Sequence, residues 1–297
     1  MDVVDAQLHI GPGMIDSTLE QMDAIGIRSV LIEEYWYWIR TTNPLHNHPG
    51  HEMANGAWRA SFPTAETASI LHPDRFGFFV RVDRNDPDLE CVMRVIAGSP
   101  HARAFRFLAT RNREEAAAFI AGGYVEPFEL VQELELPVCL AIPGYVEHLA
   151  QYATRFPDVQ FVVDHWGFAM ANNTSEQPEG DHRRAMGVGY LDVILGLAEQ
   201  PNVSIKISHG HSFFGATAPG YEAVRPHLRR VIETFGADRV LWSTDQTVTH
   251  PSASWSDLLH TVADDPELSA EEKELVLGAN ARRIFDWPVA APPPGRA

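Results

Sequence analysis

Eight short runs rich in β-branched and aromatic residues constrain the fold of this chain most strongly, because helical patterns separate them. The runs are VVDAQLHI (3–10), SVLIEEYW (29–36), FGFFVRVD (76–83), ARAFRFLA (102–109), PVCLAIPG (137–144), VQFVVDHW (159–166), VSIKISHG (203–210) and RVLWSTDQ (239–246). Eight βα units favour an α/β fold of the (β/α)8 TIM-barrel type, which typically takes about 250 residues. No Gly-x-Gly-x-x-Gly follows a strand, so a dinucleotide-binding sheet loses its main support.

Helical periodicity accounts for many of the segments between these runs. Helices are predicted at 17–27, 88–97, 125–134, 145–155, 221–235 and 270–279. Ser17 and Glu20 have the spacing of a capping box, which predicts the start of the first helix.

We predict one TIM-barrel domain over residues 1–288 and a disordered tail over the proline-rich residues 289–297. Three insertions, 37–63, 168–184 and 211–220, follow predicted strands, at the end of the barrel where such enzymes keep their chemistry. Long loops in compact domains are commonly lids. The first loop carries His46, His48 and His51, whose role the sequence leaves open.

Charge and composition exclude several classes of partner. The formal net charge of −17 argues against nucleic acid and anionic membranes, which need a basic face. Cys91 and Cys139 lack metal-pair spacing, and we expect buried thiols rather than a disulfide. No signal peptide or membrane span is evident, so we expect a cytoplasmic protein that binds a small-molecule substrate. The oligomeric state stays open.

Polar residues at strand ends predict one pocket. Side chains two apart on a strand share a face, so Asp5, Gln7 and His9 are expected to point the same way. His165 and Asp245 close later apolar strands. Asp5 lies further from the mouth of the barrel and is expected to be a buried hydrogen-bonding group.

Six segments together resemble a known family: VDAQLHIG, ARAFRF, FPDVQFVVDHWG, SIKIS, RVLWSTDQ and GANARRIFDWP. Their order and approximate spacing are similar to those of the amidohydrolase-2 group of the amidohydrolase superfamily, and especially to its metal-free 2-pyrone-4,6-dicarboxylate lactonases. The resemblance spans most of the chain and implies a TIM barrel that hydrolyses lactones or amides. Related branches decarboxylate aromatic acids.

The departures from the family pattern concern the metal. Superfamily members that hold a divalent ion commonly use His-x-His on strand one, histidines on strands five and six, and aspartate on strand eight. Here Gln7 replaces the first histidine and CLAIPG offers none. His9, His165 and Asp245 remain as a ligand set for one zinc or manganese ion. Because a neutral amide is a poor zinc ligand, we predict a site that works without a cofactor or metal.

In the metal-free hypothesis, Asp245 accepts a proton from the attacking water. His9 and His165, helped by the Gln7 amide, hydrogen-bond the oxygen on which negative charge develops. The family resemblance places the proton-transfer carboxylate at Asp245.

Cations in apolar strands point to a carboxylated substrate, because a buried charge needs a partner. Arg106 and Lys206 are the candidates, with internal ion pairs to Asp83, Asp5 or Glu33 as the alternative, and Arg81, which is close to Asp83, leans toward a structural role. His209 and His211 are expected to line the substrate pocket, one of them as a possible proton donor.

Two other functions stay open. One is a metal-dependent decarboxylase of an aromatic acid that uses His9, His165 and Asp245 around one ion. The other is a degenerate barrel that binds a ligand without turnover. The aromatic residues of the loops favour a planar organic substrate in either case.

Overall fold

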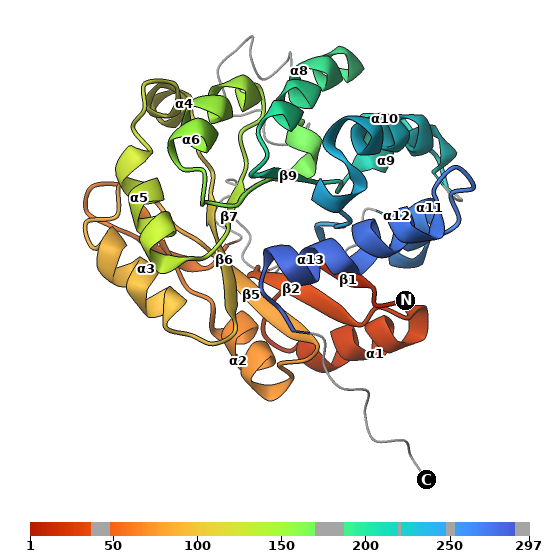
Figure 1. Ribbon diagram of the computed structural model, residues 1–297. Helices are drawn as coiled ribbons and strands as arrows, with labels where there is room; N and C mark the ends of the chain where they lie inside the picture. The colour runs from red at the N-terminus through yellow and green to blue at the C-terminus, as the bar shows by residue number, and fades with distance from the viewer. Residues whose placement is uncertain (37–47, 170–186, 219–220, 248–252, 289–297) are drawn as a thin grey trace.

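The computed structural model describes residues 1–36, 48–169, 187–218, 221–247 and 253–288. A barrel of parallel strands stands inside a ring of helices (Figure 1). Its strands are β1 (Val4–Ile10), β2 (Ser29–Glu34), β5 (Phe76–Arg81), β6 (Ala102–Phe107), β7 (Val138–Leu140), β8 (Phe161–Val163), β9 (Val203–Lys206), β10 (Val240–Leu241) and β11 (Gln246–Thr247). Each of the eight predicted runs contains strand residues, and the TIM-barrel prediction is confirmed.

The helices cover the outside of the barrel. They are α1 (Ile15–Ile25), α2 (Pro63–Leu71), α3 (Leu89–Ala97), α4 (Arg113–Ile120), α5 (Val125–Leu134), α6 (Leu149–Arg155), α8 (Leu191–Leu195), α9 (Gly210–Phe213), α10 (Arg225–Phe235), α11 (Trp255–Ala263), α12 (Ala270–Glu274) and α13 (Asn280–Ile284). Short 3₁₀ helices are η2 (Val146–His148), η3 (His165–Gly167), η5 (Val188–Tyr190), η6 (Gly196–Glu199), η7 (Glu222–Val224) and η8 (Ala237–Arg239), and η9 (Leu275–Ala279) is a π-helix.

The predicted capping box at the first helix is wrong. α1 begins two residues earlier than predicted, its N-cap is Met14, and the Ser17 hydroxyl donates to the Met14 carbonyl instead (3.1 Å). A genuine capping box lies at α12, where Ser269 and Glu272 each accept a hydrogen bond from the other's backbone N–H. Ser17 and Ser269 both have a glutamate three residues later, so this spacing did not show which of them forms a capping box.

A divided eighth strand closes the barrel. The strand order is β10-β9-β8-β7-β6-β5-β2-β1-β11, and both β10 and β11 belong to the eighth predicted run. β10 pairs with β9, while β11 pairs in parallel with β1. Between them, the Asp245 N–H donates to the Gln7 carbonyl (2.8 Å) and the Ala6 N–H donates to the Trp242 carbonyl (3.1 Å). Closure therefore fixes Asp245 beside Gln7.

An irregularity in β1 changes which side chains face the pocket. Asp5 pairs with Val30 and Leu8 pairs with Ile32, so an advance of three residues along β1 corresponds to an advance of two along β2. Asp5 consequently turns away from Gln7 and His9, and it accepts hydrogen bonds from the Thr244 hydroxyl and Trp255 Nε1. The prediction that all three share one face is wrong, whereas a buried hydrogen-bonding role for Asp5 is confirmed.

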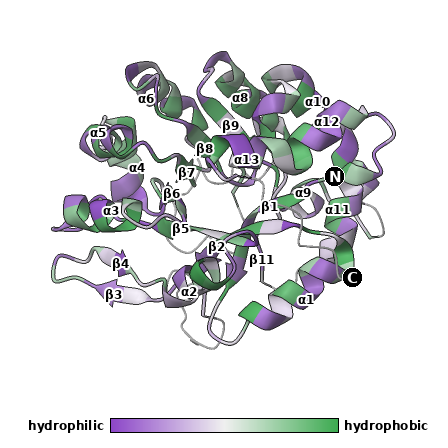
Figure 2. Ribbon diagram, turned by 60° about the horizontal axis from the view of Figure 1, so that its bottom comes forward, coloured by the Kyte–Doolittle hydropathy of each residue, from purple (hydrophilic) through white to green (hydrophobic). Residues whose placement is uncertain are grey.

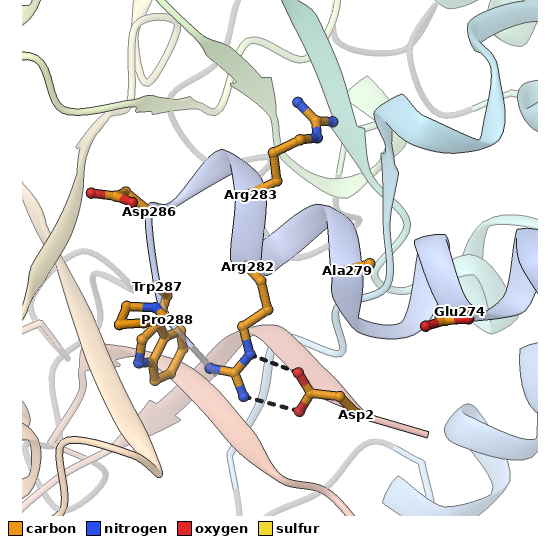
Figure 3. A pocket seen from close by; sticks show the side chains of 8 residues that line it. All are labelled: Asp2, Glu274, Ala279, Arg282, Arg283, Asp286, Trp287 and Pro288. Atoms are coloured by element: carbon orange, nitrogen blue, oxygen red, sulfur yellow. Dashed lines mark hydrogen bonds and ion pairs between the residues drawn. The ribbon is translucent and has the colours of Figure 1, made fainter. Parts of the chain in front are cut away.

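Helix α13 closes the end of the barrel at which the strands begin. Its Ile284 and the following Phe285 pack with inward-facing strand residues such as Phe79 in a separate apolar cluster. A pocket of about 460 Å³ lies beside this helix, where Arg282 forms a bidentate ion pair with Asp2 (2.9 and 3.0 Å; Figure 3). The pocket is at the amino ends of the strands, opposite the carboxyl ends at which TIM barrels keep their active sites.

The described part of the first insertion forms a hairpin, β3 (Gly50–Glu52) and β4 (Trp58–Ala60), which projects beside α2 and α3 (Figure 2). Arg59 ties it to Asp86 (2.8 Å). Residues 37–47 of this loop, 170–184 of the second insertion and the predicted tail 289–297 lie outside the described residues. Within the described ranges, no helix has the length and apolarity needed to cross a membrane.

We expect Gly278→Ala to destabilise the protein, because a Cβ at Gly278 would lie 1.7 Å from the backbone oxygen of Asp2. Overpacking of this kind costs at least about 1–3 kcal/mol, which thermal or urea unfolding would measure. Gly196→Ala is the matched control: its φ is −60° and nothing lies within 4 Å of the added Cβ. A stability equal to that of the parent in Gly278→Ala would contradict this packing.

Candidate active site

The carboxyl ends of the strands bring the predicted site residues together. Gln7 and His9 lie on β1, His165 follows β8, His209 follows β9, and Asp245 lies between β10 and β11. His165, His209 and Asp245 all have positive φ, at 54°, 60° and 56°. Non-glycine residues adopt this left-handed conformation at a cost and concentrate at functional sites. Three consecutive strands in the barrel thus end in the same strained backbone.

The Asp245 carboxylate is the centre of the site. Its Oδ1 accepts hydrogen bonds from Gln7 Nε2 (2.6 Å) and His9 Nε2 (2.8 Å), and its Oδ2 accepts one from His209 Nε2 (2.8 Å). His165 Nε2 lies 3.8 Å from Oδ2, beyond hydrogen-bond distance. The side chain is 11% exposed, so solvent reaches it. Oδ1 therefore accepts two hydrogen bonds, whereas Oδ2 accepts one and can accept another.

Electrostatics favour the ionised form of Asp245. Burial alone would raise its pKa, but His165, His9 and His209 together hold that pKa well below its ordinary value. Burial likewise acts to lower the pKa of His9, yet the Asp245 and Glu33 carboxylates more than offset it and raise the His9 pKa. Both shifts favour the charged forms, a carboxylate on Asp245 and an imidazolium on His9.

A buried cation orients Gln7. Lys206 Nζ donates to Gln7 Oε1 (3.0 Å), contacts Cys139 Sγ (3.2 Å) and pairs with Asp164 Oδ1 (3.1 Å). Burial alone would lower the pKa of Lys206, but Asp164 and Cys139 offset this and raise it, so that the ammonium stays charged. Gln7 thus joins a buried cation to the carboxylate of Asp245.

A second buried cluster surrounds Glu33 at the end of β2. Arg106 Nη1 donates to Glu33 Oε2, and Arg81 Nε lies 3.3 Å from Oε1. His48, from the first insertion, lies with Nδ1 3.7 Å from Glu33 and accepts from Arg81 at Nε2 (3.0 Å). Burial opposes ionisation, but Arg106 and Arg81 outweigh it and hold the pKa of Glu33 far below its ordinary value. His9 Nδ1 is 3.6 Å away, so the two clusters meet at His9.

The contacts of His165 determine which of its nitrogens carries the proton. Arg106 Nη2 lies 3.3 Å from His165 Nε2, and Ser208 Oγ lies 2.7 Å from Nδ1. Because a guanidinium can only donate, Nε2 must be the acceptor and Nδ1 carries the hydrogen. Burial lowers the pKa of His165 to about 4, so the ring is neutral. Its Nε2 lone pair is therefore engaged by Arg106, and Nε2 lies 3.8 Å from Asp245 Oδ2.

These contacts favour the internal-ion-pair alternative for two predicted substrate ligands. Arg106 donates to Glu33 and to Asp164 Oδ2 (2.8 Å), and Lys206 is fully buried against Asp164. Both charges are matched inside the chain, so neither requires a substrate carboxylate. Arg81 also pairs internally, with Glu33, which was one of the three expected partners.

The histidines divide between the site and its surroundings. His209 contacts Asp245 directly, whereas His211 is half-buried beside Tyr221 (ring centroids 5.2 Å apart), and burial lowers its pKa to about 4. Of the loop histidines, His48 reaches the site, His51 lies on the exposed hairpin, and His46 is outside the described residues.

Sequence reasoning missed His48, Asp164 and Ser208 as members of the site. Asp164 directly precedes His165 at the end of a strand, which could have marked it. Nothing in the sequence distinguished His48 from its two loop neighbours.

Two groups of described side chains converge closely enough to be tested as metal sites: His9, Glu33 and His48, and His165, His209 and Asp245. The first fits a cation poorly, because Arg81 and Arg106 already neutralise Glu33. In the second, Arg106 donates to His165. Gln7 turns its NH₂ group toward Asp245, so its oxygen is not available there. The donor set does not fit the family's metal.

Fold and strand-end site together define a TIM-barrel enzyme with a carboxylate and histidines at its mouth. The family model Amidohydro_2, described as amidohydrolase, matches residues 4–287. The chain therefore belongs to the amidohydrolase family, and the predicted family is confirmed.

Individual relatives are more distant. An L-fucono-1,5-lactonase of Burkholderia ambifaria is 28% identical over 151 residues, covering 49% of this chain and 48% of that protein. An uncharacterized protein y4mH of Sinorhizobium fredii is 28% identical over 101 residues, or 34% of this chain and 29% of that protein. The matches thus span half or less of these curated relatives.

Solved structures agree in fold. An amidohydrolase of Burkholderia multivorans with bound zinc has a TM-score of 0.69 at 16% identity, covering 97% of this chain and 100% of that one. A probable 2-pyrone-4,6-dicarboxylic acid hydrolase of Acinetobacter baumannii with citric acid bound has a TM-score of 0.65 at 14% identity, covering 96% and 100%.

We expect Arg106→Met to lower stability rather than to weaken a substrate carboxylate contact. Removing one partner of a buried ion pair costs about 3–5 kcal/mol, and here both Glu33 and Asp164 lose theirs. Urea unfolding would measure the loss. Arg94→Met, which breaks the exposed ion pairs of Arg94 with Glu90 and Glu133, is the control and should change stability little. Unchanged stability together with selectively weaker binding of acidic ligands would restore the substrate role of Arg106.

Proposed function

We propose that this protein hydrolyses the ring ester of a small lactone, with Asp245 as the base and without a tightly bound metal. The observation that carries the proposal is the Oδ2 atom of Asp245, which receives only the His209 hydrogen bond among the described side chains. The Asp245 side chain is 11% exposed, so a water molecule can donate a hydrogen bond to Oδ2. The lone pair of that water can then face an acyl carbon.

In the proposed reaction, the water oxygen attacks the lactone carbonyl while Asp245 Oδ2 takes its proton. A tetrahedral oxyanion forms, and the ester C–O bond then breaks. The leaving ring oxygen takes the proton from Asp245, which restores the carboxylate and gives an open hydroxy acid. His9 and His209 stabilise Asp245 by hydrogen bonds on its two oxygens throughout.

The Arg106 guanidinium lies at the His165 side of this water position. It replaces the predicted donor role of His165, whose Nε2 is an acceptor. Arg106 therefore supplies positive charge next to the developing oxyanion while its own charge stays balanced by Glu33 and Asp164. Gln7 acts on Asp245 in this scheme and does not contact the substrate.

The relatives support a lactone as the substrate class. The partial match is to a protein named L-fucono-1,5-lactonase, and one structural neighbour is named a probable 2-pyrone-4,6-dicarboxylic acid hydrolase. These substrates share a six-membered ring ester. Because Arg106 and Lys206 are paired internally, we propose the ring ester as the recognised group and no longer require a carboxylate on it.

Asp245→Asn should lower kcat by about 100-fold or more on a lactone that the protein hydrolyses, because it removes the base and keeps its size. A panel of sugar-acid and pyrone lactones, followed by acid release, would supply the substrate. Asp158→Asn, an exposed position at the opposite end of β8, is the control and should retain the parent rate. Parent-like turnover in Asp245→Asn would move the base elsewhere.

The metal-free proposal makes a separate prediction. Protein purified without a histidine tag should carry well under one equivalent of zinc or manganese by elemental analysis, and dipicolinate should leave activity intact. The reason is that Gln7 and the guanidinium groups occupy the surroundings of the candidate ligands. A stoichiometric ion required for turnover would favour a metallohydrolase or the aromatic-acid decarboxylase.

A further inference from the structure

Lys206 is fully buried, and its ammonium group makes more contacts than are needed to balance its charge. Its exposed fraction is 0%, and Asp164 already provides a carboxylate at 3.1 Å. Nevertheless the ammonium also donates to the Gln7 side chain at 3.0 Å. Lys206 does not contact Asp245, and Gln7 is the residue that joins them. The contact with Gln7 is therefore additional to the charge balance that Asp164 provides.

We propose that Lys206 is a positioning residue, which locks the Gln7 amide with its NH₂ group against Asp245 and so leaves Oδ2 as the working oxygen. The inference rests on the proposed role of Asp245 as the base. Lys206 acts only through Gln7 in this arrangement, and it touches neither the water position nor the substrate.

Hydrogen-bond chemistry permits one orientation of the amide. An ammonium only donates, so it must face Gln7 Oε1, and a carboxylate only accepts, so it must face Nε2. A flipped amide would place NH₂ against Lys206 and oxygen against Asp245 Oδ1, where the separation is 2.6 Å. Both contacts would then be repulsive. The cation therefore selects the amide rotamer that holds Asp245.

The lock determines which oxygen of Asp245 works. Gln7 and His9 both donate to Oδ1, which fixes this oxygen and the plane of the carboxylate. Oδ2, which receives only the His209 hydrogen bond among the described side chains, then points to within 3.8 Å of His165 Nε2. Without the Gln7 contact, the carboxylate can rotate and Oδ2 no longer holds a water molecule in one fixed direction. A small angular error of this kind lowers the rate and not the affinity.

A spectroscopic experiment tests the lock without any substrate. In protein labelled with ¹⁵N-glutamine, the Gln7 side-chain NH₂ signal is assigned by its loss in Gln7→Met. We expect a downfield, slowly exchanging proton in the parent protein, because Nε2 donates to a buried carboxylate. Lys206→Met should remove both features. Cys139→Ala, which deletes another neighbour of Lys206 and leaves the amide untouched, is the control and should keep them. An unchanged Gln7 signal in folded Lys206→Met would overturn the proposal.

Kinetics provide the second test. On a hydrolysed lactone, Gln7→Met should lower kcat about ten- to a hundred-fold with little change in KM, and Lys206→Met should do the same. In the double variant the losses should not add, since Lys206 acts through Gln7. Additive losses, or an effect of Lys206→Met confined to KM, would show independent roles and contradict the proposal that Lys206 acts through Gln7. Gln7→Met keeps the Lys206–Asp164 pair, so the inference stays testable if Lys206→Met fails to fold.

The two tests separate the failure of this inference from that of the proposed function. If Asp245→Asn retains turnover while the Gln7 signal still depends on Lys206, the amide lock exists but Asp245 is not the base. If Asp245→Asn is inactive and the signal ignores Lys206, the base stands and the lock does not.

Discussion

The site depends on a buried carboxylate that is kept ionised. A charge taken out of water needs several donors, and Asp245 obtains them from two strands: Gln7 and His9 lie on β1, and His209 follows β9. This requirement explains why the eighth strand is divided: β10 and β11 both pair normally, while the chain between them bends to bring Asp245 inward. The same bend between β10 and β11 therefore closes the barrel and positions Asp245 in the site.

Charge balance extends this argument to the whole mouth of the barrel. The carboxylates of Glu33, Asp164 and Asp245 face the cations of Arg81, Arg106 and Lys206, with His9 between them. Buried ion pairs are specific rather than strongly stabilising, because desolvation offsets most of their attraction. Their value here is positional: each guanidinium or ammonium fixes the orientation of a neighbouring acceptor. The amide of Gln7 and the ring of His165 are both oriented in this way.

The sequence predicted the barrel and the strand-end residues because both follow from local patterns. Alternating runs identified all eight strands, and His165 and Asp245 were found by their positions at strand ends. The face of Asp5 was not predictable, because a register irregularity in β1 depends on pairing with β2. Of the two partners of Arg106, Glu33 was one of three expected candidates, whereas Asp164, 58 residues away in the chain, was not expected. Contacts of that range are set by tertiary packing alone.

The replacement of histidine by Gln7 illustrates how a single residue alters the available chemistry. An imidazole at this position could offer a nitrogen lone pair to an ion, whereas the amide presents a donor to Asp245 and an acceptor to Lys206. The same carboxylate that could bind a cation is thereby occupied by hydrogen-bond donors. Its remaining acceptor capacity is on Oδ2, beside the neutral His165. A carboxylate with acceptor capacity on one oxygen is suited to orienting water, and the amide at Gln7 is therefore consistent with the proposed hydrolysis by a positioned water.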